Sequence, residues 1–340
     1  MEETKNKPTI EDVAKRCGVS VSTVSRVINR STPVSTDLNL RVRKAIKELG
    51  FTPRQWKDRT IARTVVLVIP DILNPYYGEI IHGAQEEADK QGLRMVVMYI
   101  SEDPALQRKH LSLLSQWMFD GLIVTGTRLS SKFLVKLHED YRMPIVVSRS
   151  KETEAFPCVI PDMKAAIYQS TKYLISLHHE RIAFLSGPPE WNSSRIRVEA
   201  ITRALGEASL SMDANLHRHC LPTVEAGFQT GRNLMALPDN TRPTAILAFN
   251  DLVAVGVLRA IHSIGLRVPR DVSVIGADDL DLAAYTIPSL TTISQPTFRL
   301  GQVSMQKIVD LLQGNLTFAP EITFLECPLI LRESTAPCTL

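Results

Sequence analysis

The sequence predicts an N-terminal all-α helix-turn-helix headpiece joined to a larger α/β domain with parallel sheets in two lobes. Three observations predict this fold class. Helix caps and glycine stops occur in the first fifty residues, apolar strands alternate with helical segments from residue 65 onward, and 340 residues are too many for one ordinary core. We expect residues 1–50 to form the headpiece and residues 51–64 to form a hinge or linker.

The composition excludes several classes of protein. Hydrophobic residues make up 44% of the chain and charged residues 22%, which excludes a disordered or fibrous protein. No apolar run approaches the ~18 residues that span a bilayer. The polar N-terminus lacks the pattern of a secretory signal, so we expect a cytoplasmic protein without a membrane partner. Five scattered cysteines predict reduced thiols, with neither disulfides nor a metal site.

Charge is distributed unevenly along the chain. Residues 1–63 contain 14 Lys and Arg against 7 Asp and Glu, a net charge of +7, whereas the remaining residues contain 25 against 29, a net charge of −4. Basic side chains provide the sequence-independent part of DNA affinity, because they neutralise phosphates. The asymmetry therefore favours a polyanion-binding headpiece, although a solvated basic helix face would produce the same count.

The first two predicted helices are separated by a tight turn. Thr9, followed by Asp12 three residues later, has the pattern of a helix N-cap, and Gly18 can adopt the left-handed conformation that ends a helix. Ser20 is placed to cap a second helix over residues 21–28. Two short helices joined by a glycine-bearing turn predict a helix-turn-helix, whose second helix lies in the DNA major groove.

A third helix completes the predicted headpiece. Ser35 is its expected N-cap and Gly50 its stop. The apolar residues that close the small core recur at helical spacing and are Leu38, Val42, Ile46 and Leu49. A plain helical hairpin is the alternative, but the caps, the turn, the apolar stripe and the charge all favour the helix-turn-helix.

From residue 65 onward, short apolar segments alternate with helical ones. The expected strands cover residues 65–69, 94–99, 122–125, the vicinity of 159, 181–185, 245–249 and 272–275. Because a parallel crossover needs a connecting helix, the alternation predicts parallel sheets covered by helices. Two such halves form a cleft in which ligands bind at the carboxyl ends of strands.

Several motifs are typical of one family of regulators. In the headpiece they are TIEDVA at 9–14, GVS at 18–20, TVSRVIN at 23–29 and KELGFTP at 47–53. In the α/β part they include VIPD at 68–71, NPYY at 74–77, FND at 249–251 and DVSVIG at 271–276. On these motifs the chain resembles the lactose/galactose repressor (LacI/GalR) family over nearly its whole length.

This resemblance implies a two-lobed α/β domain like that of periplasmic binding proteins. The expected lobes comprise residues 65–161 with 293–325, and residues 162–292 with 326–340. The implied function is that of a repressor that binds palindromic double-stranded operator DNA as a homodimer under the control of a small polar ligand. A periplasmic binding protein itself is excluded by the basic headpiece.

The resemblance also implies which residues contact DNA. Base contacts are expected from Val21, Ser22 and Arg26, since an arginine can make a bidentate contact with guanine. Phosphate contacts that fix the register are expected from Thr9, Thr23, Ser25 and Asn29. In the linker, where the family pattern is less well matched, Ile61 is the expected minor-groove wedge and Trp56 the alternative.

In the α/β domain, the resemblance places a further set of side chains in the ligand cleft. They are Tyr76, Tyr77, Arg195, Asn250, Asp278 and Gln295, whose hydrogen-bonding and stacking groups suit a polar ligand. Two positions depart from the family pattern: Ser148 stands where an aspartate is usual, and Pro222 where an aromatic residue is expected. With Arg149 directly after Ser148, we hypothesise that Arg149 and Arg195 favour an anionic effector such as a sugar acid or sugar phosphate, a surface ion pair being the alternative.

No motif predicts an enzyme, a catalytic residue, a cofactor or a metal site. The segments His217–Cys220 and Asp278–Asp279 with Asp281 contain groups that could bind a metal or form a carboxylate pair. Neither has familiar ligand spacing. An exposed strand and a polar loop with one ligand-binding aspartate are the better interpretations.

Overall fold

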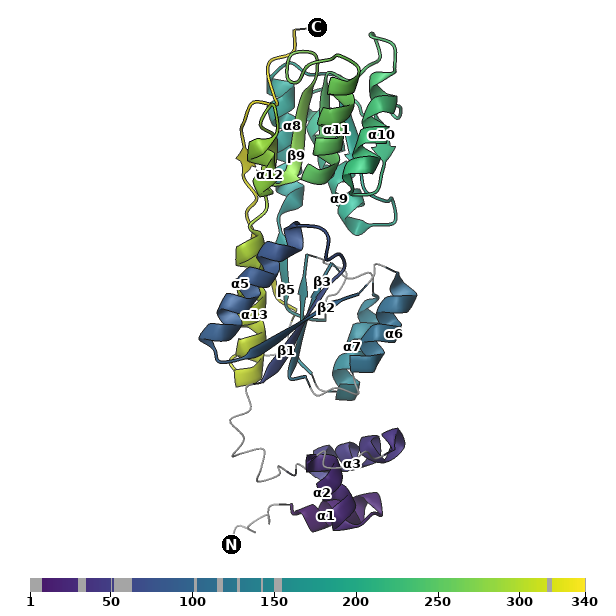
Figure 1. Cartoon of the computed structure of the whole chain (residues 1–340), viewed down its shortest axis with the longest axis vertical. Helices are drawn as coiled ribbons and strands as arrows, with labels where there is room; N and C mark the ends of the chain where they lie inside the picture. Colours follow the sequence, from purple (N-terminus) through teal and green to yellow (C-terminus); the bar gives the residue numbers. More distant parts are fainter. Residues whose placement is uncertain are drawn as a thin grey trace. The chain divides into compact units, whose positions relative to one another are not determined.

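A computed structural model describes residues 8–29, 35–49, 51, 63–100, 103–114, 119–126, 129–141, 143–149, 155–316 and 320–339. The chain divides into two compact units, Met1–Ala62 and Arg63–Leu340, which are described separately (Figure 1).

The first unit contains the three predicted helices: α1 (Ile10–Cys17), α2 (Val21–Asn29) and α3 (Thr36–Leu49). Thr9 caps α1 in a reciprocal capping box with Asp12, and Gly18 ends it at a φ of 66°. The Ser20 hydroxyl accepts a hydrogen bond from the Thr23 amide at 3.2 Å and so caps α2. The caps predicted for these two helices are confirmed.

A small apolar core joins these helices. Its buried side chains come from all three: Val13, Ala14, Cys17, Val24, Val27, Ile28, Val42, Ala45 and Ile46. Arg41 of α3 donates a hydrogen bond to the Cys17 carbonyl at 2.7 Å, and Arg16 pairs with Glu48 at 2.7 Å. Core and polar contacts together hold α1 against α3, which leaves the outer face of α2 open.

The second unit contains two six-stranded sheets. The first has the order β11-β5-β4-β3-β1-β2, and all its strand pairs are parallel. Its strands are β1 (Thr64–Ile69), β2 (Arg94–Tyr99), β3 (Gly121–Thr125), β4 (Ile145–Ser148), β5 (Cys158–Pro161) and β11 (Ile322–Leu325). The near-continuous apolar sequence of β1 follows from burial on both faces of a parallel sheet.

Helices cover both faces of this sheet. On one face lie α5 (Tyr76–Lys90) and α13 (Thr297–Gln313), and on the other α6 (Pro104–Leu114) and α7 (Ser131–Tyr141) (Figure 1). Alternate side chains of β1 point to opposite faces of the sheet. Val65 and Leu67 pack with α5 and α13, whereas Val66 and Val68 pack with α6 and α7.

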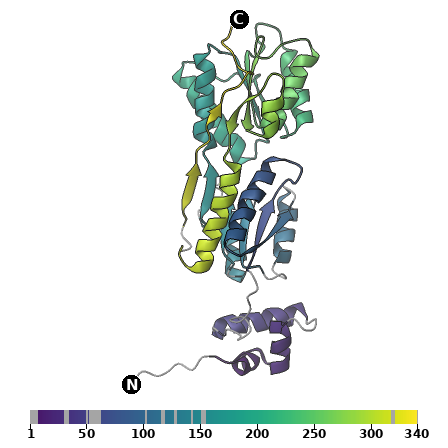
Figure 2. The ribbon, with the colours of Figure 1, turned by 60° about the vertical axis from the view of Figure 1, so that its left-hand side comes forward.

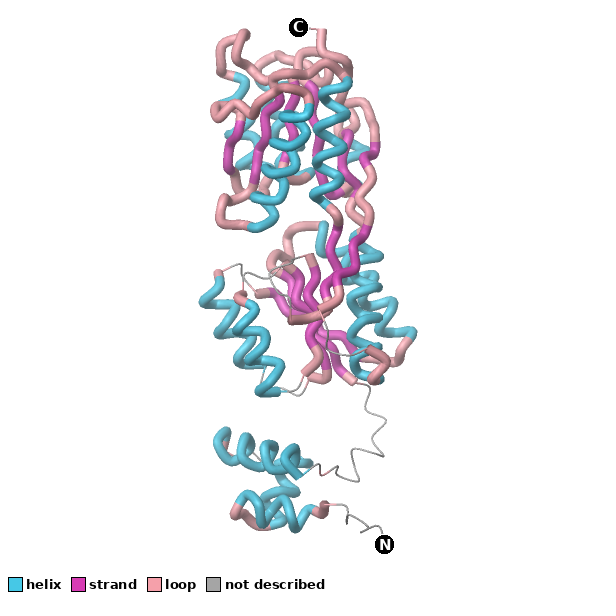
Figure 3. Tube along the Cα trace, turned by 180° about the vertical axis from the view of Figure 1, so that it is seen from behind, coloured by secondary structure: helices cyan, strands magenta, loops and turns pink. Residues whose placement is uncertain are grey.

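The second sheet has the order β12-β10-β9-β8-β6-β7, and β12 alone among these described strands pairs antiparallel. Its strands are β6 (Ile182–Ser186), β7 (His217–His219), β8 (Ala245–Ala248), β9 (Ser273–Asp278), β10 (Thr291–Ser294) and β12 (Leu329–Ile330). The helices of this lobe are α8 (Met163–Ser176), α9 (Asn192–Glu207), α10 (Val224–Met235), α11 (Asp251–Ser263) and α12 (Asp281–Tyr285). Figure 3 shows strands of this sheet between its helices.

The chain passes between the two sheets after β5, after β10 and between β11 and β12 (Figure 2). The lobe boundary expected at 292/293 falls inside β10. Because the whole of β10 pairs with β9, the passage lies after Ser294. Within the described residues, no helix combines the length and apolar character needed to cross a membrane.

Glycines allow α5 and α13 to pack in direct contact. A Cβ on Gly83 would lie 2.0 Å from the Phe298 carbonyl oxygen, and one on Gly301 would lie 2.1 Å from the Ile80 carbonyl oxygen. Both distances are far shorter than a van der Waals contact. The absence of side chains at these two positions therefore fixes the spacing of the helices that cover one face of the first sheet.

Candidate DNA-binding surface and ligand cavity

The outer face of α2 presents the side chains predicted to read bases. Ser22 and Arg26 are exposed, and Val21 is 39% exposed although it is apolar. The opposite face of α2 is buried in the headpiece core through Val24 and Val27. Packing of one face thus orients the other toward solvent, as a recognition helix requires.

The predicted phosphate-contacting residues lie at the start of α1 and along α2. Thr9 is exposed and occupied in capping α1, with its hydroxyl 2.8 Å from an Asp12 carboxylate oxygen. The Thr23 hydroxyl lies 2.8 Å from that of Ser20, and Ser25 is half-buried. Asn29 is the last residue of α2. Ile61 and Trp56 lie outside the described residues.

A cavity of about 400 Å³ lies between the two lobes of the second unit. Its polar lining includes all but one of the predicted ligand-binding residues, namely Tyr76, Tyr77, Arg149, Asn250, Asp278 and Gln295. Tyr76 and Tyr77 begin α5, and Asp278 ends β9, so these side chains are placed at the carboxyl end of the parallel sheets, where α/β folds bind ligands.

Arg195 is the exception, and its predicted position is wrong. Its side chain is exposed on α9, where it donates a hydrogen bond to Asn192 Oδ1 at 2.6 Å, and it does not line the cavity. Two residues further along α9, Arg197 is only 3% exposed and does line the cavity. A two-residue step in a helix rotates the side chain by more than half a turn, which explains the different surroundings.

The guanidinium group of Arg197 is held against Phe249. It lies 4.1 Å from the centre of the Phe249 ring and donates a hydrogen bond to the Phe249 carbonyl oxygen. Its Nε is buried and has no hydrogen-bond partner among the described residues. Burial lowers the pKa of Arg197 to about 10, so the group remains protonated at neutral pH.

Asp278 lies at the end of a buried polar chain. The Tyr76 hydroxyl donates to Gln295 Oε1 at 3.0 Å, and Gln295 Nε2 donates to Asp278 Oδ1 at 2.6 Å. Burial, followed by repulsion from the Asp251 carboxylate, raises the pKa of Asp278 to about 8. Asp278 is therefore largely protonated at neutral pH.

Arg149 extends over the two tyrosines. It occupies the left-handed region at a φ of 67°, and its guanidinium carbon lies 4.3 Å from the centre of the Tyr76 ring and 5.3 Å from that of Tyr77. Arg149 also donates a hydrogen bond to the Tyr77 hydroxyl. Its interactions with the described residues are with two aromatic rings and a tyrosine hydroxyl, and no ion pair is among them.

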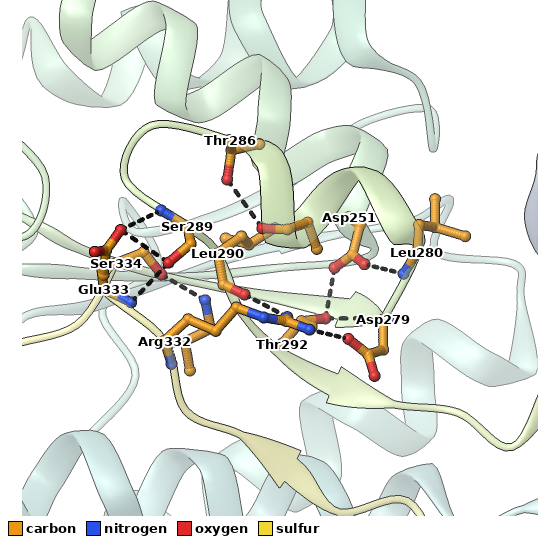
Figure 4. A network of polar contacts seen from close by, with 12 residues as sticks. Asp251, Asp279, Leu280, Thr286, Ser289, Leu290, Thr292, Arg332, Glu333 and Ser334 are labelled. Atoms are coloured by element: carbon orange, nitrogen blue, oxygen red, sulfur yellow. Dashed lines mark hydrogen bonds and ion pairs between the residues drawn. The ribbon is translucent and has the colours of Figure 1, made fainter.

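A network of polar contacts holds the backbone around Asp279 and Leu280, directly after Asp278 (Figure 4). Asp251 accepts hydrogen bonds from the Leu280 amide at 2.8 Å and from the Thr292 hydroxyl at 2.5 Å. Arg332, near the C-terminus, pairs with Asp279 at 2.7 Å. Asp278 and Asp279 both have positive φ, of 131° and 58°, and these contacts hold that sparsely populated conformation.

Comparison with known proteins identifies the family. The description "Bacterial regulatory proteins, lacI family" matches residues 9–54, and "Periplasmic binding protein-like domain" matches residues 171–335. The HTH-type transcriptional regulator DegA of Bacillus subtilis is 33% identical over 337 residues, which cover 97% of this chain and 99% of DegA. The chain belongs to the lacI family.

Solved structures of transcription regulators confirm the predicted fold class. The transcriptional regulator CelR in complex with cellobiose is 30% identical with a TM-score of 0.73, covering 96% of this chain and 99% of CelR. The lac repressor dimer bound to operator and the anti-inducer ONPF is 27% identical with a TM-score of 0.74, covering 97% of this chain and 100% of that one. The chain is thus a DNA-binding transcription regulator of the lacI family and not an enzyme.

Sequence reasoning missed part of the cavity of this lacI-family chain. Arg197, Trp191 and Phe249 line it and were not predicted. The signal for Arg197 was the helical spacing of buried residues in α9: position 197 lies on the same face as Ala200, Ile201 and Ala204, and position 195 does not. Pro222 lines the cavity, and Ser148 is fully buried.

Proposed function

We propose that this chain is a repressor that binds palindromic operator DNA as a homodimer and is controlled by a small polar ligand in the inter-lobe cavity. The observation that carries the proposal is the presence in one chain of an exposed recognition face on α2 and a polar cavity of about 400 Å³. We place the protein in the cytoplasm, where such an operator is accessible. The operator-bound lac repressor dimer supports the proposal by similarity.

On DNA, Arg26 contacts a guanine edge in the major groove, and Val21 and Ser22 contact neighbouring bases. Thr9, Thr23, Ser25 and Asn29 contact phosphates and fix the register of the headpiece. The linker over residues 51–64 carries Ile61, or alternatively Trp56, as an apolar wedge in the minor groove. A two-fold symmetric dimer places two α2 helices in half-sites about one helical turn apart.

In the cavity, Asn250, Asp278 and Gln295 hydrogen-bond the ligand, while Tyr76 and Tyr77 form one wall. Asn250 lines the cavity and caps α11 with its side-chain oxygen, which accepts from the Val253 amide at 2.9 Å; the side-chain amide nitrogen takes no part in this cap. The CelR–cellobiose complex supports a sugar-like ligand by similarity. A ligand held by both lobes stabilises one relative pose of the lobes and thereby changes the affinity for DNA.

The proposal is tested by selecting DNA from a random pool with the full-length protein and measuring binding of the selected site by fluorescence anisotropy. We expect a palindrome, bound by a dimer, with an affinity that a cavity ligand changes by about 5–150-fold. Arg26→Ala should relax base preference at one position of each half-site, whereas Thr23→Ala should weaken all sequences alike. Enrichment of no common sequence would refute the proposal.

A further inference from the structure

Two guanidinium groups line the cavity and have no acidic partner among the described residues. Arg149 follows β4 in the first lobe, and Arg197 lies on α9 in the second lobe. Within the described part of the chain, no carboxylate oxygen lies within 4.0 Å of either guanidinium group, so neither forms an ion pair. Exposed arginines such as Arg203 and Arg267 do form ion pairs. The two guanidinium groups of the cavity are therefore not neutralised by direct pairing within the described structure.

An unpaired charge in a buried position is unfavourable because it loses hydration without gaining a counter-charge. Arg197 is 3% exposed, and its Nε has no hydrogen-bond partner in the described ranges. Hydrogen bonds to the other guanidinium nitrogens therefore offset the cost of burial only in part. Arg149 contacts two tyrosine rings and one hydroxyl, which provide weak stabilisation compared with an anion.

The acidic residues of the cavity do not supply the missing charge. Asp71 and Asp162 bind backbone amides, of Leu73 at 2.9 Å and of Ala165 at 3.1 Å. Asp278 is the acidic cavity residue that interacts electrostatically with both arginines. Burial and repulsion from Asp251 raise its pKa to about 8, so it carries little negative charge at neutral pH. An incoming anion would meet the Arg149 and Arg197 cations beside a largely neutral Asp278. The carboxylates of Asp71 and Asp162 are held by backbone amides, and the Lys164 ammonium by Glu199.

On this basis, we propose that the cavity binds a small organic anion whose carboxylate or phosphate group is held by Arg149 and Arg197, one from each lobe. The inference rests on the proposed function, because it names the ligand class of the same cavity. Trp191 and Phe249, whose ring centres are 6.0 Å apart, form an apolar wall for the rest of the ligand. Because the two arginines belong to different lobes, an anion that contacts both favours one pose of the lobes.

Trp191 provides a local reporter for the test. In a full-length Trp56→Phe/Trp117→Phe background, Trp191 is the remaining tryptophan of the three in the chain. Its fluorescence is titrated at constant ionic strength with inorganic phosphate, acetate, and matched neutral and anionic pairs: glucose, gluconate and glucose 6-phosphate, and ribose with ribose 5-phosphate. The carboxylate and phosphate series separate the two possible sources of the anionic group.

We expect an anionic compound to change the fluorescence saturably, with at least tenfold higher affinity than its neutral partner. Arg149→Gln should reduce this affinity by at least tenfold, as loss of a charge-assisted hydrogen bond does. Arg195→Gln is the matched control: the same residue type on an exposed face outside the cavity, expected to change the affinity less than twofold. Circular dichroism of each variant confirms that it is folded.

Three results would overturn the inference. The first is equal or tighter binding of the neutral partner, and the second is an affinity for the anion that Arg149→Gln leaves unchanged. The third is no saturable response to any of the anions, each titrated to 20 mM. Operator binding is measured in parallel on the wild-type protein, because Trp56 is the alternative minor-groove wedge and is replaced in the fluorescence background. Loss of site-specific DNA binding would refute the proposed function without bearing on the anion, whereas a failed anion test with intact operator binding would refute the anion alone.

Discussion

Replacing Asp278 by Asn should remove a pH-dependent cost of folding. The pKa of Asp278 is raised from its ordinary value of 3.8 to about 8 by burial and by Asp251. An acid whose pKa is raised in the folded state stabilises the fold below the unfolded pKa, and this stability is lost as pH rises through the folded pKa. Wild-type stability should therefore decrease between pH 4 and pH 8 through this group, by about 1.4 kcal/mol per pH unit.

Asn is close in shape to the protonated acid and can still accept the hydrogen bond from Gln295. Between pH 5 and pH 7, the free energy of unfolding of Asp278→Asn should rise relative to wild type by about 2–3 kcal/mol. Urea denaturation followed by circular dichroism at each pH measures this difference. Asp281→Asn, which changes an exposed carboxylate of α12, is the control and should show no such trend. A difference independent of pH would show that Asp278 is ionised in the folded protein and refute the reasoning.

Three further predictions concern the headpiece and the helix packing. Arg26→Ala should cost about 1–3 kcal/mol of discrimination at one base position, which competition with single-base operator variants measures; uniform weakening would contradict a base contact. Thr9→Ala removes the capping box of α1 and should destabilise that helix by about 1 kcal/mol, seen as faster amide exchange at its start; unchanged exchange would show that the cap is unimportant. Gly83→Ala places a Cβ 2.0 Å from the Phe298 carbonyl oxygen and should cost about 3 kcal/mol or more in urea denaturation. Gly78→Ala in the same helix meets no atom within 4 Å and should be neutral or slightly stabilising; equal effects of the two glycine substitutions would refute the packing argument.

The headpiece was predictable because its signals are local. A cap such as Thr9 and a stop such as Gly18 act within one turn of helix, so adjacent residues suffice to place the ends of α1. The parallel strands were predictable for a related reason: burial on both faces requires a continuous apolar run, as in β1.

The cavity was less predictable because its geometry depends on residues far apart in the sequence. The choice between Arg195 and Arg197 depends on which face of α9 is buried by the rest of the lobe. The left-handed backbone of Arg149, which directs its side chain over Tyr76, has no local signal in a residue with a Cβ. The ion pair between Arg332 and Asp279 connects residues 53 positions apart in the sequence. No periodic pattern of residues predicts a contact over that separation.

The central claim is that a ligand in the cavity controls sequence-specific DNA binding by α2. The most direct test is the affinity of the full-length protein for its selected palindrome and for a scrambled duplex, at about 0.15 M salt, with and without a compound that binds at Trp191. We predict at least about 10³-fold preference for the palindrome and a ligand-dependent change of about 5–150-fold in that affinity. Equal affinity for both duplexes, or an affinity for the palindrome that a saturating cavity ligand leaves unchanged, would contradict the claim.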